Sequence, residues 1–407
     1  MNKPVFGPAP PGTVTSNAGS TVRIAPWQAP FDTGPAVALR RRLLDTRWSD
    51  QVAPDWSYGT AEQPLRQLVQ HWQSGYDWEL AAARLNGLPH FRAEIDGFGI
   101  HFLHFKARGA TGQPLLLMNG WPSSFVEYTK LAAILADPAS HGGQAGDAFD
   151  VVMPAHPGFG YSDRPGAPDQ AHSVDLFLRL MTDGLGYASF IASGTDIGAG
   201  VATRMALKYP DQVCGIHISA VIDPPLTDAS PPLSELERDY VACVARWHDQ
   251  EGAYAHVQST RPQTLAYALN DSPLGLASWI LEKFHRWGDT GPDLFAVFPA
   301  DMLLDNLNIY WSTQTIGASL RYYYEARHFR TPFIPADRVH VPTAICVWPK
   351  DLVRPPEEWA RRFYNVCQYR VQARGGHFPA WEQPRLYADD LWLFLKTLRE
   401  RGAIGMV

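Results

Sequence analysis

Short apolar segments that alternate with helical segments constrain the fold of this chain more than any other feature. Four such segments, each of which leads into a loop, are residues 115–118, 149–153, 189–192 and 343–347. Runs of this length and composition are typical of parallel strands that are buried on both faces. The segments with helical periodicity are residues 126–135, 173–184, 199–209 and 386–399. The alternation predicts an α/β fold with a mostly parallel, doubly wound sheet and crossover helices.

A hairpin precedes these strands in the prediction. Apolar side chains alternate along residues 91–95 and again along residues 98–102, as on two half-buried strands. Asp96-Gly97 stands between them and suits a tight two-residue turn. We therefore expect an antiparallel pair at the start of the sheet.

The rest of the chain divides around this sheet. Residues 224–339 have helical periodicity without an evident buried strand, which predicts a lid over the carboxyl ends of the strands, where open α/β sheets bind ligands. The many aromatic residues before the sheet need a surface to pack against. The five predicted segments are a flexible N-terminal tail (1–21), a meander that packs on the core (22–95), the first part of the α/β core (96–223), the helical lid (224–339) and the second part of the core (340–407).

Composition excludes several classes of protein. Apolar residues make up 45% of the 407 residues and charged residues 19%, so most of the chain has the composition of a globular protein. The net charge of −6 and the lack of a long basic run argue against a nucleic-acid partner. The sequence contains no run of about 18 apolar residues, so it predicts no membrane-spanning helix. The first residues do not resemble a secretory signal. We expect a cytoplasmic protein with buried free thiols at Cys214, Cys243, Cys346 and Cys367.

A glycine-flanked turn carries the first chemical signal. Gly194-Thr195-Asp196-Ile197-Gly198 lies between the apolar segment 189–192 and a predicted helix. Small residues on both sides of a central reactive residue are what a sharp strand-to-helix elbow requires. The motif alone is weak, because an aspartate that caps a helix at a tight turn would look the same.

Two further residues strengthen the catalytic interpretation. His377 follows a predicted strand at residues 369–373, and Asp351 follows the strand at 343–347. The order nucleophile, acid, histidine along the chain is that of the α/β-hydrolases. Since all three residues come after predicted strands, we expect Asp196, Asp351 and His377 to meet at one edge of the sheet as a catalytic triad.

The sequence also predicts an oxyanion hole. Asn119-Gly120-Trp121-Pro122 leaves the strand at 115–118 and can direct the Trp121 amide toward the site. The Ile197 amide, at the start of the helix after the elbow, would be the second donor. An ordinary turn between a strand and a helix is the alternative.

These motifs resemble those of the epoxide hydrolases of the microsomal type, which are α/β-hydrolases with an extra N-terminal region. The likeness extends from about Pro26 to Tyr387, and the elbow, the Asn-Gly-Trp-Pro loop and Gly375-Gly376-His377-Phe378 lie where that family has them. Its N-terminal signature is matched by Leu44-Asp45-Thr46-Arg47-Trp48, Asp55-Trp56-Ser57-Tyr58-Gly59, Tyr76-Asp77-Trp78 and Arg84-Leu85-Asn86.

The resemblance implies two lid tyrosines that donate hydrogen bonds to the epoxide oxygen. Local context matches Tyr254 and Tyr323, with Tyr324 as the next choice for the second donor. Two positions depart from the family pattern: Asn119 replaces the usual histidine, and Ile197 replaces the usual tryptophan after the nucleophile. Because the oxyanion donors are backbone N–H groups, the hole can survive both changes.

The predicted reaction is the hydrolysis of a small hydrophobic epoxide to a vicinal diol through an ester on Asp196, without a metal or organic cofactor. A haloalkane dehalogenase uses the same triad, but Ile197 lacks the indole donor that a halide requires there. A non-catalytic binding protein with the same fold is a third interpretation, and the intact triad argues against it. We also consider a homodimer.

Overall fold

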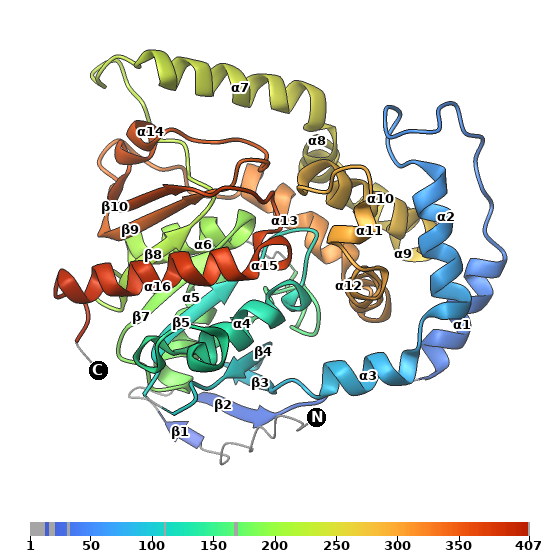
Figure 1. Ribbon diagram of the computed structural model, residues 1–407, viewed down its shortest axis with the longest axis horizontal. Helices are drawn as coiled ribbons and strands as arrows, with labels where there is room; N and C mark the ends of the chain where they lie inside the picture. The colour runs from blue at the N-terminus through green and yellow to red at the C-terminus, as the bar shows by residue number, and fades with distance from the viewer. Residues whose placement is uncertain (1–12, 16–20, 31–32, 110, 167–169, 406–407) are drawn as a thin grey trace.

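A sheet of ten strands forms the centre of the protein (Figure 1). The computed structural model describes residues 13–15, 21–30, 33–109, 111–166 and 170–405. In spatial order the strands are β1 (Thr13–Thr15), β2 (Thr21–Pro26), β3 (His90–Ile95), β4 (Phe98–Phe105), β6 (Phe149–Pro154), β5 (Gln113–Met118), β7 (Phe190–Gly194), β8 (Val213–Ile218), β9 (Val339–Val347) and β10 (Tyr364–Val371). The pairs from β1 to β6 are antiparallel and those from β6 to β10 are parallel.

The sheet confirms the predicted fold class, with three strands that the sequence analysis did not suggest: β1, β2 and β8. The four apolar segments and the strand before His377 form β5, β6, β7, β9 and β10. The hairpin of β3 and β4 is also present, and it pairs Ile95 with Phe98 across the turn. Among these, β8 belongs to the parallel part of the sheet, and its sequence contains Gly215 and His217 and so lacks a continuous apolar run. It lies buried between β7 and β9.

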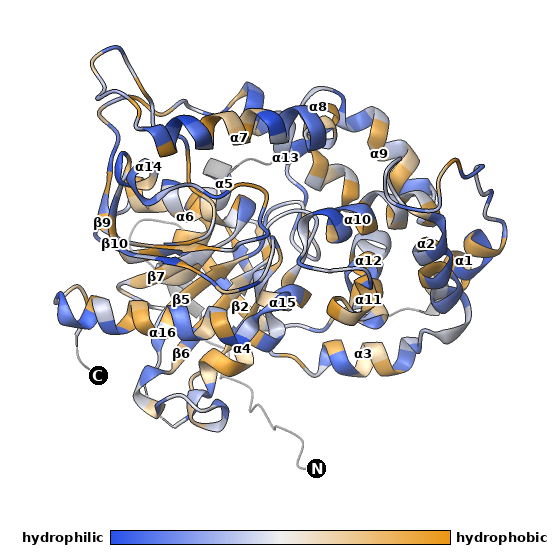
Figure 2. Cartoon of the chain, turned by 45° about the horizontal axis from the view of Figure 1, so that its top comes forward, coloured by the Kyte–Doolittle hydropathy of each residue, from blue (hydrophilic) through white to orange (hydrophobic). Residues whose placement is uncertain are grey.

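Helices cover both faces of the sheet. In Figure 1, α4 (Thr129–Ala136) and α16 (Pro384–Glu400) lie on one side of the strands, and α5 (Gln170–Arg179) and α6 (Asp196–Lys208) lie on the other. Figure 2 shows hydrophobic strands between these layers. Because β5, β7, β9 and β10 belong to the parallel part of the sheet, their carboxyl ends lie at the same edge.

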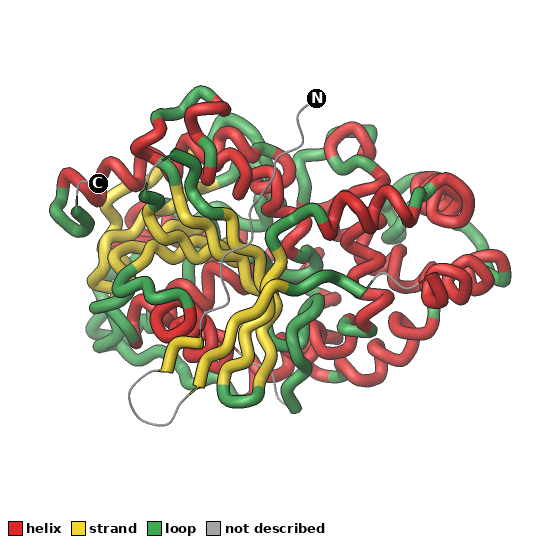
Figure 3. The backbone as a smooth tube through the Cα atoms, turned by 90° about the horizontal axis from the view of Figure 1, so that it is seen from below, coloured by secondary structure: helices red, strands yellow, loops and turns green. Residues whose placement is uncertain are grey.

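The N-terminal region both joins the sheet and binds the lid. Strands β1, β2 and β3 extend the sheet, so Thr13–Thr15, within the predicted tail, pair with β2; residues 1–12 and 16–20 of that tail lie outside the described residues. Between β2 and β3 come α1 (Thr33–Leu44), α2 (Glu62–Gln70), the π-helix η1 (His71–Gly75) and α3 (Trp78–Asn86). Figure 3 shows these helices gathered with those of the lid at one end of the sheet.

The lid is entirely helical, as predicted. It consists of α7 (Glu235–Glu251), α8 (Ala253–Thr260), α9 (Pro262–Asp271), α10 (Pro273–Trp287), α11 (Leu294–Val297), α12 (Ala300–Thr313) and α13 (Ile316–His328). Every residue from 224 to 338 is described, and none of them is in a strand. A turn at Gln314, which has a φ of +54°, separates α12 from α13.

Buried hydrogen bonds hold the N-terminal region to the lid. Tyr76 donates its hydroxyl hydrogen to Asp305 on α12 at 2.6 Å, and Arg84 contacts both oxygens of that carboxylate at 2.7 Å. One turn farther along α12, Asn308 accepts a hydrogen bond from the Trp72 indole at 2.9 Å. Two side chains on one face of α12 thus receive the aromatic and basic residues of the N-terminal segment.

Candidate active site

The elbow between β7 and α6 holds Asp196 in a left-handed backbone conformation. Its φ is +48°, which costs a residue other than glycine about 1–3 kcal/mol and persists only where the surroundings enforce it. The surroundings are too crowded for side chains: a Cβ at Gly194 would lie 2.5 Å from the backbone of Gly198, and one at Gly198 would lie 2.3 Å from the Met118 carbonyl oxygen. The small residues of the motif are therefore required by packing.

The loop after β5 binds the Asp196 carboxylate. The Trp121 backbone N–H donates to Asp196 Oδ1 at 2.9 Å. Gly120 lets the loop approach, since a Cβ there would lie 2.3 Å from Asp196 Cβ. The buried His156 imidazole bonds the Asn119 carbonyl oxygen through Nε2 at 2.9 Å, while the Asn119 side chain donates to the Gly120 carbonyl oxygen at 2.9 Å. Asn119, which departs from the family pattern, and His156 therefore both support this loop.

Lid helix α12 supports the loop from the other side. The Asn306 amide donates to the Pro122 carbonyl oxygen at 2.9 Å, and the Tyr310 hydroxyl donates to the Ser123 carbonyl oxygen at 3.2 Å. Because α12 also receives the N-terminal region, the lid, the N-terminal helices and this loop form one connected set of buried contacts.

His377 lies between the two carboxylates. Its Nδ1 is 2.7 Å from Asp351 Oδ1, and its Nε2 is 3.9 Å from Asp196 Oδ2. Burial opposes a charged imidazole, but the negative charges of Asp351 and Asp196 outweigh it and raise the pKa of His377 to about 9. The structure thus brings together all three residues of the predicted triad, with Nε2 directed toward Asp196 and too far from it for a hydrogen bond.

Two residues that the sequence did not suggest hold the histidine loop. The Glu382 carboxylate accepts hydrogen bonds from the backbone N–H groups of Asp289, Gly376 and Phe378 at 2.7–2.9 Å. Trp287, at the end of α10, accepts the His377 N–H on its carbonyl oxygen at 2.8 Å and packs its ring 5.2 Å from the imidazole. Glu382 lies five residues after the histidine, and no local pattern distinguishes it from an exposed glutamate.

The two predicted lid tyrosines face the site together. The ring of Tyr254 stacks 5.6 Å from that of Trp121, and the ring of Tyr323 lies 5.9 Å from Trp121 and 5.8 Å from Tyr254. Burial raises the pKa of both hydroxyls well above the ordinary value, and the charge of Asp196 adds to the shift. Both groups are therefore protonated donors at neutral pH. Tyr324, the alternative candidate, packs against His328 instead, at 4.3 Å.

The second predicted oxyanion donor lies in the first turn of α6. Ile197 follows Asp196 directly, and backbone N–H groups in a first helical turn have no acceptor within the helix. Its side chain is apolar, so the only donor that Ile197 offers to the site is its backbone amide.

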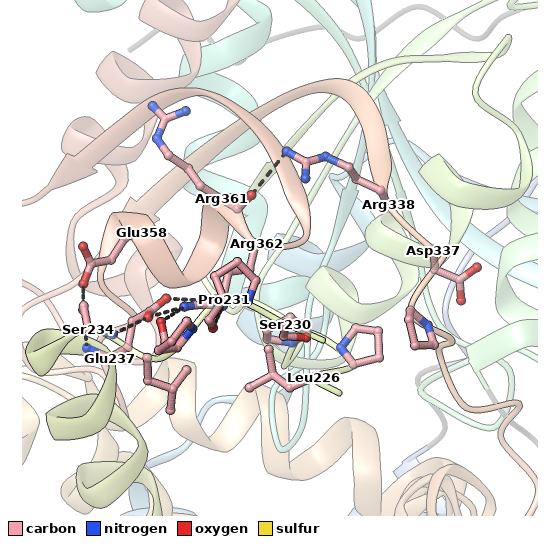
Figure 4. Close-up of a pocket in the computed structure, with 15 residues that line it drawn as sticks. Leu226, Ser230, Pro231, Ser234, Glu237, Asp337, Arg338, Glu358, Arg361 and Arg362 are labelled. Carbon is pink, nitrogen blue, oxygen red and sulfur yellow. Dashed lines mark hydrogen bonds and ion pairs between the residues drawn. The ribbon is translucent and has the colours of Figure 1, made fainter. Parts of the chain in front are cut away.

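Asp196 also lines an open cleft of about 430 Å³. The walls include the apolar residues Val221, Ile222 and Phe333 and the charged residues Asp223 and Arg330. A larger hollow of about 550 Å³ lies elsewhere, against the loop before α7 and against α14 (Glu357–Arg361) (Figure 4). There the Arg362 guanidinium donates hydrogen bonds to the Glu237 carboxylate and to the Pro231 carbonyl oxygen. These contacts already occupy the charge of Arg362.

The thiols and a buried polar cluster differ from expectation. All four cysteines are free, but only Cys346 is buried, so the prediction of four buried thiols is wrong.

Cys346 lies beside His217 and Asp390 in an arrangement compact enough for a metal ion. However, Asp390 already accepts hydrogen bonds from His217 at 2.8 Å and from two glutamine amides, and Arg370 lies 3.1 Å from its other oxygen. Protein donors thus occupy the carboxylate.

The fold and this geometry define an α/β-hydrolase with an aspartate at the elbow. Two family models agree: "Epoxide hydrolase N terminus" matches residues 24–128, and "alpha/beta hydrolase fold" matches residues 113–264. Epoxide hydrolase 1 of Sus scrofa is 34% identical over 375 residues, which cover 84% of this chain and 82% of the relative. The chain belongs to the epoxide hydrolase family and is an enzyme that hydrolyses epoxides.

Solved structures agree with this placement. The juvenile hormone epoxide hydrolase of the silkworm Bombyx mori superimposes with a TM-score of 0.83 at 27% identity, over 94% of this chain and 96% of that one. The epoxide hydrolase of Aspergillus niger gives a TM-score of 0.79 at 27% identity, over 92% and 96%. The predicted fold and family are therefore confirmed. Within the part of the chain that the structure describes, no helix is both long and apolar enough to cross a membrane.

Proposed function

We propose that Asp196 opens a hydrophobic epoxide by direct attack and that the resulting ester is hydrolysed with the help of His377. The line of contacts from Asp351 through His377 to Asp196, at 2.7 and 3.9 Å, carries this proposal. The rings of Trp121, Tyr254 and Tyr323, which lie together next to the Asp196 loop, favour a hydrophobic substrate. A cytoplasmic location and a homodimer remain predictions from the sequence.

In the first step, an Asp196 carboxylate oxygen forms a bond to an epoxide carbon while the carbon–oxygen bond of the ring breaks. The negative charge moves from the carboxylate to the former ring oxygen. Tyr254 and Tyr323 donate hydrogen bonds to that oxygen, because their raised pKa keeps both hydroxyls protonated. These hydrogen bonds become stronger as negative charge develops on the oxygen, so they stabilise the transition state more than the bound epoxide.

In the second step, His377 removes a proton from a water molecule, which attacks the ester carbonyl of Asp196. The ester carries no charge, so one of the groups that raises the pKa of His377 is gone, and a larger fraction of the imidazole is neutral and able to accept a proton. The Trp121 amide, which contacts Asp196 Oδ1 at 2.9 Å, and the Ile197 amide stabilise the tetrahedral oxyanion. His377 returns its proton to the leaving oxygen as the ester bond breaks. The regenerated carboxyl group releases its remaining proton to solvent and the former ring oxygen takes one up, so a neutral diol leaves and the Asp196 carboxylate is restored.

A single turnover in ¹⁸O-labelled water tests this sequence of steps. Attack on the ester carbonyl places the first label in the Asp196 side chain, so the first diol carries none. His377→Gln should form the ester and accumulate it, which mass spectrometry of the intact protein would detect, and Asp196→Ala should form neither ester nor diol. Label in the first diol, or turnover by Asp196→Ala, would refute the ester route. A parallel panel of haloalkanes tests the dehalogenase alternative.

A further inference from the structure

A buried lysine lies behind one of the lid tyrosines. Lys283 is on α10 and is only 6% exposed. Its ammonium nitrogen lies 4.9 Å from the ring centre of Tyr254, 5.4 Å from that of Trp279 and 5.6 Å from that of Trp287. Trp279 and Trp287 stand four residues before and after Lys283, so they flank it along one face of the helix. Tyr254 closes this aromatic cage from α8.

Packing alone does not account for a lysine at this position. Removing an ammonium group from water is costly, and lysine is almost never fully buried without a partner. Its ion-pair partner is the neighbouring Glu282 carboxylate. An unbranched apolar residue would fill the same space without the desolvation cost. The attraction between the cation and the three ring faces is the compensating interaction that the geometry provides.

The cage connects this cation to the reacting atoms. Tyr254 stacks on Trp121, whose backbone amide contacts Asp196, and Trp287 packs against His377. During ring opening the negative charge leaves Asp196 and appears on the epoxide oxygen, to which Tyr254 donates in the proposed mechanism. As the tyrosine oxygen takes up part of this charge its ring becomes more electron-rich, so the attraction of the ammonium increases in the transition state.

We propose that Lys283 is a positioning residue for epoxide opening, whose ammonium group over the ring of Tyr254 strengthens the hydrogen bond from that tyrosine to the departing oxygen. The inference rests on the proposed role of Tyr254 as a donor. The charged groups that face Tyr254 are the Glu282 and Asp196 carboxylates, and both raise the pKa of its hydroxyl.

The test measures the rates of ester formation and of ester hydrolysis separately, in single turnovers of styrene oxide. Tryptophan fluorescence in a stopped-flow instrument monitors both steps. Lys283→Met should slow ester formation by about 10- to 30-fold, the size of a desolvated cation–π contact, and change ester hydrolysis by less than about 2-fold. Lys283→Arg should restore most of the rate. Lys396→Met, which removes an exposed lysine on α16, is the matched control and should behave as wild type. Equal losses in both steps for Lys283→Met, without rescue by Lys283→Arg, would mean a merely structural role and would overturn the proposal.

A double-mutant cycle separates this inference from the proposed function. If Lys283 acts through Tyr254, adding Lys283→Met to Tyr254→Phe should slow ester formation little beyond Tyr254→Phe alone. Independent, multiplicative losses would overturn the inference and leave Tyr254 as a donor. If Tyr254→Phe forms the ester at the wild-type rate, the donor assignment itself is wrong and the role of Lys283 falls with it. A slow Tyr254→Phe beside a wild-type Lys283→Met would refute only the lysine proposal.

Discussion

Replacing Gly120 with alanine should misplace the nucleophile. The added Cβ would lie 2.3 Å from Asp196 Cβ and 2.4 Å from Asp196 Oδ1, whereas ordinary contacts begin at 3.4 Å. Relief of the overlap requires a displacement of about 1 Å between the loop and Asp196, and a misplacement of about 1 Å costs roughly 100-fold in rate. The loss corresponds to about 3 kcal/mol in the barrier for ester formation.

Single-turnover ester formation measures this effect directly, since the displacement acts on the attacking atom. Gly146→Ala is the matched control, because a Cβ there meets nothing within 4 Å, and it should retain wild-type rates. Thermal unfolding of both variants separates misplacement from loss of fold. Wild-type ester formation by a folded Gly120→Ala would show that the loop and the elbow are less closely packed than their contacts indicate, and it would refute the reasoning.

Three further predictions concern groups around the site. Asp305→Ala should lower the free energy of unfolding by about 1–3 kcal/mol, because a buried tyrosine hydroxyl loses its acceptor; Asp301→Ala, an exposed carboxylate on the same helix, should cost at most about 1 kcal/mol in the same denaturant titration. Glu382→Gln should slow ester hydrolysis about 10-fold, because one amide oxygen cannot accept three backbone N–H groups; an unchanged hydrolysis rate would contradict this role. Ester hydrolysis should rise with pH as His377 loses its proton, with a midpoint below about 9, and Asp351→Asn should move the midpoint to lower pH because the carboxylate charge raises this pKa; a midpoint that moves to higher pH would refute the assignment.

Most of the candidate active site was predictable because its sequence signals are local. The glycines around Asp196 are required by contacts within the elbow and with the neighbouring strand, and short apolar strands place the following residue at the carboxyl edge of a parallel sheet. The order of Asp196, Asp351 and His377 along the chain then indicates which three strand ends must meet. The elbow and each strand end can be read from a sequence because each is marked by residues that follow one another along the chain.

Other features depended on packing between distant segments. Strand β8 was missed because His217 and Gly215 interrupt its apolar run, although Asp390 of α16 binds that histidine in the folded chain. In the sequence, Glu382 cannot be distinguished from an exposed helical glutamate. Its role is evident only in the structure, where backbone N–H groups of the histidine loop and of the lid donate to its carboxylate. A buried polar residue is identified by its partners, and only the tertiary structure supplies them.

The lid tyrosines show which features the sequence determines and which depend on the tertiary structure. The sequence alone determined that aromatic hydroxyls stand on lid helices, but Tyr323 and Tyr324 are neighbours whose side chains point about 100° apart on a helix. The rotation of α13 against α8 and α9 decided that Tyr323 meets Trp121 and Tyr254, while Tyr324 packs on His328. Helix rotation is set by packing against the whole lid, because the apolar and aromatic residues of neighbouring helices must fit together at once.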